Sequence, residues 1–126
     1  MNISNFISKS SFEAIQWSMK QRKMFKYQKE VKTKEGKFQV RLDAKYMNPD
    51  VAEKIWNGQD YIFGVDVNYV GPKVGFGGMG HCFSNYEEIF SSWKSFKEWF
   101  DKQMKPFEKY GYESDGDEYG QMSLFW

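Results

Sequence analysis

The sequence predicts an α+β fold in which helices cover an antiparallel sheet made of two β-hairpins. Two runs that alternate between apolar and polar residues flank a short glycine-containing turn, a pattern typical of a β-hairpin. Other segments repeat apolar residues every three or four positions behind capping residues, which predicts helices. Twelve Phe, eight Tyr and five Trp make 20% of the chain aromatic, so we expect a core built from rings. The expected element order is α-ββ-α-ββ-α.

The first helix and the first hairpin follow from capping residues and from alternation. Ser10 and Glu13 have the spacing of a capping box and predict a helix over residues 11–22. The period then changes to two, because residues 25–33 and 38–46 both alternate apolar with polar side chains. Since neighbouring side chains on a strand point to opposite faces, this hairpin should present one apolar face and one basic, polar face.

A short helix and a second pair of strands should follow the hairpin. Asn48 and Pro49 supply an N-cap and a first-turn proline, and Gly58 supplies a stop. Tyr61–Val70 has the alternation of a third strand, with its aromatic and β-branched residues on the inner face. The glycine-rich segment Val74–Phe83 is expected to form the fourth strand.

The last helix should be the most amphipathic helix of the chain. Ser84 and Glu87 form a second capping box and predict its start, and Pro106 predicts its end or a kink. Its apolar residues follow helical spacing: Ile89, Trp93, Phe96, Phe100 and Met104. This periodicity is lost further on. We therefore expect one globular domain over residues 1–110, and over residues 111–126 a flexible acidic linker that ends in an apolar peptide.

Basic residues concentrate in the first part of the chain, although the net charge is only +1. Residues 1–45 contain eleven Lys and Arg against four Asp and Glu. A two-stranded β-ribbon fits the major groove of DNA, and cations beside it can neutralise phosphates. The candidate nucleic-acid contacts are Arg22, Lys23, Lys26, Lys32, Arg41 and Lys45. The plainer alternative is a solvated basic surface without a specific partner.

No set of residues predicts catalysis, and we expect no cofactor. The GxGxxG pattern at residues 75–80 lacks the helix that must follow it directly in a dinucleotide site. His81 and Cys82 are neighbours on a predicted strand, so their side chains should point to opposite faces and not form a catalytic pair. Asp66 and Asn68 share one face of the third predicted strand and could hold a divalent metal, with Asp43 as a third ligand. A metal-dependent nuclease is therefore the enzyme hypothesis to test, and a solvated strand face is the plainer alternative.

The sequence predicts a cytoplasmic protein. No stretch approaches the roughly 20 apolar residues that span a bilayer. The first residues lack the basic region and the small-residue cleavage site of a signal peptide. Cys82 is the only cysteine, which excludes an internal disulfide and suits a reducing compartment.

The acidic linker leads into a short apolar peptide, Gln121–Phe125, with the sequence Gln-Met-Ser-Leu-Phe. This peptide resembles the pentapeptide with which bacterial replication and repair proteins bind the DNA polymerase III sliding clamp. The resemblance implies that Gln121 hydrogen-bonds in a polar subsite and that Leu124 and Phe125 fill a hydrophobic pocket. Met122, where Leu is more common, would pack at the edge of the pocket. The alternative is a segment that folds back onto the domain's own core.

These observations support three classes of function. The leading hypothesis is a non-enzymatic binding protein of a bacterium, phage or mobile element. Its C-terminal peptide would tether it to the host sliding clamp, the polymerase III β subunit, and its basic hairpin would contact DNA. The second is a phage or mobile-element inhibitor, of the anti-defence (anti-CRISPR) or immunity type, that binds a host defence enzyme stoichiometrically. The third is a metal-dependent nuclease that uses Asp43 and Asp66.

Overall fold

The protein is an α+β domain with one antiparallel sheet and one layer of helices, as predicted. The computed structural model describes residues 1–34, 36–55, 57–71, 81–82 and 86–114. The helical elements are α1 (Ile3–Phe6), α2 (Lys9–Lys20), α3 (Pro49–Ile55), α4 (Tyr86–Ile89), α5 (Trp93–Met104) and the 3₁₀ helix η1 (Lys105–Tyr110). The strands are β1 (Phe25–Thr33), β2 (Gly36–Tyr46), β3 (Tyr61–Val70) and β4 (His81–Cys82).

The sheet has the order β1-β2-β3-β4, and each strand is antiparallel to the next. β1 pairs with β2 along its whole length, from Phe25 opposite Ala44 to Thr33 opposite Gly36. The predicted first hairpin and the predicted third strand are therefore confirmed. Of the predicted fourth strand, only β4 falls within the described residues, since residues 72–80 and 83–85 lie outside them.

Gly36 begins β2 at the tip of the first hairpin, where there is no room for a side chain. A Cβ atom at this position would contact the Val70 carbonyl oxygen and would lie 2.7 Å from the Gly71 Cα. Thr33 supports the same turn, because its hydroxyl donates a hydrogen bond of 2.9 Å to the Gly36 carbonyl. The turn thus packs directly against the end of β3, which joins the hairpin to the third strand.

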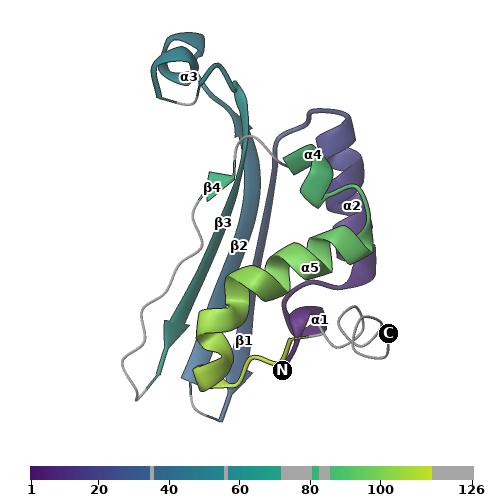
Figure 1. Ribbon diagram of the computed structural model, residues 1–126, viewed down its shortest axis with the longest axis vertical. Coiled ribbons are helices and arrows are strands. Elements are labelled where there is room, and N and C mark those ends of the chain that lie inside the picture. The colour runs from purple at the N-terminus through teal and green to yellow at the C-terminus, as the bar shows by residue number, and fades with distance from the viewer. Residues whose placement is uncertain (35, 56, 72–80, 83–85, 115–126) are drawn as a thin grey trace, which may run out of the picture.

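The helices lie mainly on one side of the sheet. α1, α2, α4 and α5 cover one face, and α3 lies beyond one end of the long strands (Figure 1). Along β3 the inward positions are almost completely buried, at 3% exposure or less: Tyr61, Phe63, Val65, Val67 and Tyr69. This inward set is the one that the alternation of the sequence predicted. The opposite face of the three long strands is mostly polar, and it is the surface considered below.

The core between the sheet and the helices consists largely of aromatic rings, as expected. Phe6 of α1 meets Phe38 of β2 edge to face, with ring centroids 5.5 Å apart. Phe63 of β3 meets Phe90, the residue after α4, in the same way at 4.9 Å. Such pairs stabilise the contact beyond the burial of their area, by about 0.5–1.5 kcal/mol each. They fix how the helical layer sits on the sheet.

The first long helix begins two residues earlier than predicted. α2 starts at Lys9, and its N-cap is Ser8, whose side chain accepts a hydrogen bond from the Ser11 amide. The predicted Ser10–Glu13 capping box is therefore wrong. A further short helix, α1, was not predicted at all; it is capped by Asn2 and buries Ile3 and Phe6. Four residues are too few to show helical periodicity in the sequence.

The short helix after β2 is bounded much as predicted. The side chain of Asn48 accepts a hydrogen bond of 2.9 Å from the Asp50 amide at the start of α3. Gly58 follows the helix with a φ of 84°, in the left-handed region that glycine adopts without strain. Val51 and Ile55 are exposed, and Ala52 is the buried residue of this helix.

The predicted last helix is two helices. α4 ends at Ile89, and α5 begins at Trp93 behind Ser92, which has extended backbone angles and accepts a hydrogen bond of 3.0 Å from the Ser95 amide. The capping by Ser92 explains the break, because an N-cap residue cannot also be helical. Pro106 lies at the start of η1, so the α-helix does end near it, as predicted.

The packed domain continues past the predicted boundary at residue 110. Tyr112 is only 3% exposed, and its ring centroid lies 5.9 Å from that of Phe6. Its hydroxyl donates a hydrogen bond to Asp101 of α5. One residue later, the Glu113 side chain forms an ion pair of 3.5 Å with the N-terminal amino group of Met1. The two ends of the described domain therefore meet beside α1.

Candidate nucleic-acid interface

The outward face of β1, β2 and β3, here called the open face, carries most of the candidate nucleic-acid contacts. Strand alternation places one polar set on it: Lys26, Gln28, Glu30, Lys32, Lys37, Gln39, Arg41, Asp43, Lys45, Asp66 and Asn68. Most of these side chains are exposed. The set holds five cations and three carboxylates, so this face is weakly basic.

Two of the cations on the open face are held by carboxylates. Arg41 of β2 forms an ion pair with Asp66 of β3, and its Nε lies 3.8 Å from Asp43. Lys37 lies 3.5 Å from Glu30 of the neighbouring strand β1. These pairs hold the side chains in place across strands, and they reduce the charge that Arg41 can offer to a phosphate.

The other three lysines of the open face, Lys26, Lys32 and Lys45, have no ion-pair partner among the described residues. All three are exposed. Lys26 and Lys45 lie at one end of the strands, near the start of β1 and the end of β2, whereas Lys32 lies at the other end of β1. These are the cations on the open face that are best placed to meet a polyanion.

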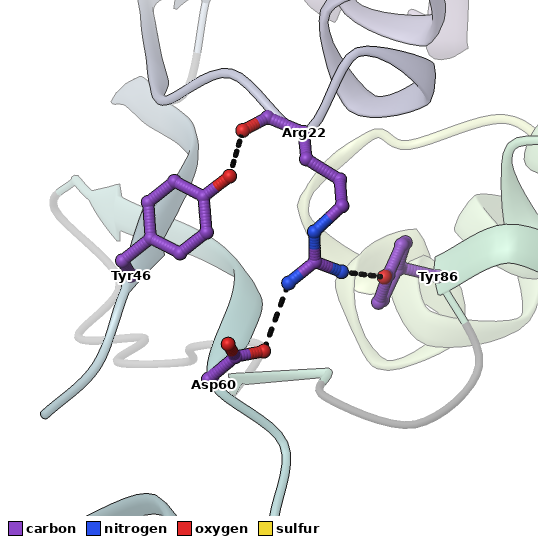
Figure 2. Close-up of polar contacts among 4 residues, drawn as sticks. All are labelled: Arg22, Tyr46, Asp60 and Tyr86. Carbon is purple, nitrogen blue, oxygen red and sulfur yellow. Dashed lines mark hydrogen bonds and ion pairs between the residues drawn. The ribbon is translucent and has the colours of Figure 1, made fainter. Parts of the chain in front are cut away.

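Arg22, a fifth candidate, is occupied in a polar cluster that joins distant parts of the chain (Figure 2). Its guanidinium donates hydrogen bonds to Asp60 Oδ1 at 2.8 Å and to the Tyr86 hydroxyl at 3.3 Å. The Tyr46 hydroxyl donates to the Arg22 carbonyl oxygen. Arg22 also has a φ of 52°, unusual for a residue other than glycine. Arg22 therefore has a structural role, and its geometry does not support the prediction that it contacts nucleic acid.

Tyr61 packs beneath the Arg22 guanidinium, whose central carbon lies 5.0 Å from the ring centroid. The Tyr61 hydroxyl donates a hydrogen bond of 2.6 Å to the Lys23 carbonyl. Burial, together with the neighbouring Tyr46 and Tyr86, raises the pKa of Tyr61 to about 12, although Arg22 opposes the shift. Tyr61 is therefore neutral throughout the physiological pH range.

Lys23 lies at the junction of α2 and β1. Its ammonium group sits 4.6 Å from the ring centroid of Trp17, which is 55% exposed. The six candidates thus separate into four on the open face and two, Arg22 and Lys23, at the junction. No local sequence signal shows that Arg22 is held by other side chains, because its partners Asp60 and Tyr86 are far from it along the chain.

The possible metal ligands do not form a site among the described residues. Asp43 and Asp66 share the open face, but Arg41 lies between them and pairs with both carboxylates. A metal ion there would have to displace a guanidinium. Within the described residues no group of three or more His, Cys, Asp or Glu side chains gathers. The backbone of β4 places His81 opposite Gly64 and Cys82 opposite Phe63.

Residues 115–126, and with them the predicted clamp-binding residues Gln121, Met122, Leu124 and Phe125, lie outside the described residues, as does the GxGxxG segment. In the described part of the chain no helix has the length and apolar character needed to cross a membrane. Comparison of the chain with protein-family models, with curated proteins and with solved structures finds no match.

Proposed function

We propose that this protein is a non-enzymatic, cytoplasmic binding protein of a bacterium, phage or mobile element that acts on DNA at the host sliding clamp. In this proposal the peptide Gln121–Phe125 attaches the protein to the clamp, and the open face contacts the DNA that passes through it. The observation that carries the DNA contact is the position of Lys26, Lys32 and Lys45, exposed and without a carboxylate partner among the described residues.

The clamp half of the proposal is supported by the resemblance of the peptide alone. Gln121 lies seven positions after Ser114, the last described residue. A chain of that length spans at most about 25 Å when fully extended. A domain held so close to the clamp would meet DNA at a high effective concentration, so a weak and sequence-independent contact would suffice.

Binding to a purified bacterial sliding clamp tests the first half. Wild-type protein should bind with micromolar or tighter affinity by calorimetry, and the Leu124→Ala/Phe125→Ala double variant should not bind, while both unfold at the same temperature. Glu118→Ala, in the acidic linker, is the matched control and should bind as wild type does. If neither protein binds the clamp and the double variant melts earlier, the peptide belongs to the core and the clamp proposal fails.

A salt titration of DNA binding tests the second half. Each lysine that neutralises a phosphate contributes roughly 0.9 to the slope of log affinity against log salt on duplex DNA. The variant Lys26→Gln/Lys32→Gln/Lys45→Gln should therefore lose up to about 3 units of slope. The control is Lys94→Gln/Lys102→Gln on α5, which removes exposed lysines from the helical side. An unchanged slope in the triple variant would contradict the DNA contact.

A stoichiometric inhibitor of a host defence enzyme is the second candidate, and one observation favours it. Ile55 on α3 is 67% exposed and Val51 is 36% exposed, four residues apart on the same side of a helix that lies beyond the end of the sheet (Figure 1). Exposed apolar residues that gather in this way often mark a protein contact. A tight complex with a host enzyme that survives removal of residues 115–126 and is lost in Ile55→Asp would support this candidate.

A further inference from the structure

The open face divides along its strands into two basic ends and a middle without excess positive charge. The strand register forms two middle rows: Gln28, Arg41 and Asp66, and then Glu30, Gln39 and Asn68. One cation and two carboxylates give these rows a formal charge of −1. The lysines stand outside them, with Lys26 and Lys45 at one end and Lys32 and Lys37 at the other.

The middle rows, together with Lys29 and Val40 between them on the same strands, line a shallow hollow of about 470 Å³. The amides of Gln28, Gln39 and Asn68 offer both donors and acceptors around it. Arg41 projects from the same area, and its ion pairs with Asp43 and Asp66 use Nε and Nη2. A guanidinium has five N–H donors in a rigid fork. The two carboxylates therefore fix the orientation of the Arg41 guanidinium without using all of its N–H donors.

We propose that the middle of the open face reads base edges in the major groove of duplex DNA, while the lysines at its two ends hold the flanking phosphates. This inference rests on the DNA contact proposed above and adds sequence recognition to it. With Lys29 included, the lining of this hollow holds two cations and two carboxylates, so it has no excess positive charge with which to bind phosphates. Amides and a guanidinium are instead the groups that pair with adenine and guanine edges.

The length of the strands agrees with this division. Lys32 lies six positions after Lys26 on β1, which is about 20 Å at the rise of an antiparallel strand. The major groove is about 12 Å wide, so the ends of the face reach past the groove to the phosphates on both sides. The groove of an A-form RNA duplex is too deep and narrow to be read in this way, so the partner is duplex DNA rather than duplex RNA.

Selection from a pool of randomised DNA duplexes, with the full chain as bait at low salt, tests the inference. We expect enrichment of a short motif. Gln39→Ala and Asn68→Ala should each weaken binding to the selected duplex about fivefold to a hundredfold, and should leave binding to an unselected duplex unchanged. Lys26→Gln/Lys32→Gln/Lys45→Gln should weaken both duplexes equally. Gln103→Ala on α5, an exposed amide of the helical layer, is the matched control.

The outcomes separate this inference from the proposed function. Binding without any enriched motif, or an equal effect of the amide variants on both duplexes, would overturn base reading and leave the phosphate contact standing. Equal binding to an RNA duplex of the selected sequence would also overturn it. No binding to any duplex would remove the DNA contact as well. If an alanine variant melts earlier than wild type, Gln39→Met and Asn68→Leu keep the side-chain size, remove the amide without adding charge, and give the same test.

Discussion

At the scale of single residues, Arg22 shows why a basic residue beside a basic hairpin need not be a binding residue. Its side chain is 45% exposed, yet its guanidinium bonds to Asp60 and Tyr86 and lies over the ring of Tyr61. These partners come from the residue before β3, from α4 and from the start of β3. The side chain therefore connects the turn after α2 to the sheet and to the helical layer.

Arg22→Lys should destabilise the protein by about 1 kcal/mol, because one ammonium group cannot replace a planar fork that bonds two partners at once. The exposure of the pair with Asp60 keeps the effect small. Chemical denaturation measures this change in the free energy of unfolding. Asp60→Asn is the second variant of a double-mutant cycle, in which the two losses of stability should not be additive. DNA affinity should stay unchanged. If Arg22→Lys keeps full stability but binds DNA more weakly, then Arg22 contacts DNA and its proposed structural role is wrong.

Tyr61 should make stability depend on pH above 10. Burial raises its pKa to about 12 in the folded protein, against about 10 when unfolded, so its contribution is complete below pH 10 and is lost as pH rises towards 12. The shift corresponds to about 2–3 kcal/mol. Unfolding curves between pH 8 and 11.5 should fall less steeply for Tyr61→Phe than for wild type. Some slope should remain, because burial also raises the pKa of Tyr27 and of Tyr86.

At the scale of elements, the strands could be predicted closely and the helix ends could not. Alternation is a local pattern, and it predicted both ends of β3 correctly. It also placed four candidate cations on one face: Lys26, Lys32, Arg41 and Lys45. The apolar spacing of the last helical region continues smoothly across Ser92, and nothing in that spacing marks the break that its capping side chain makes. Likewise, the pairing of Arg41 with Asp66 depends on the register between β2 and β3, which alternation alone leaves open.

Ser92→Ala should cost about 1 kcal/mol, because it leaves the Ser95 amide at the start of α5 without its hydrogen bond. Ser92→Asp keeps a capping oxygen and should restore most of the stability. The two variants are compared with wild type by denaturant unfolding. If aspartate destabilises as much as alanine, then Ser92 acts through packing and the explanation of the helix break by capping is wrong.

At the scale of the whole molecule, the last described residues and the open face lie on different sides of the sheet. The chain passes Tyr112 and Glu113 beside Met1 and α1, on the side of the sheet that carries the helices (Figure 1). The open face is on the other side of the same sheet. A domain tethered through its helical side would keep that face free, so attachment to a clamp and contact with DNA would not compete for one surface.

This arrangement makes the position of a truncation decisive for stability. A chain ending at Ser114 should be as stable as the full protein within about 0.5 kcal/mol, because every described core contact is kept. A chain ending at Tyr110 loses the buried Tyr112 ring, its hydrogen bond to Asp101 and the Glu113–Met1 ion pair, and should lose about 3–5 kcal/mol. Denaturant unfolding of both chains measures the difference, and Tyr112→Phe in the longer chain isolates the hydroxyl. Equal stability of the two truncated chains would mean that the domain ends at residue 110, as the sequence first predicted.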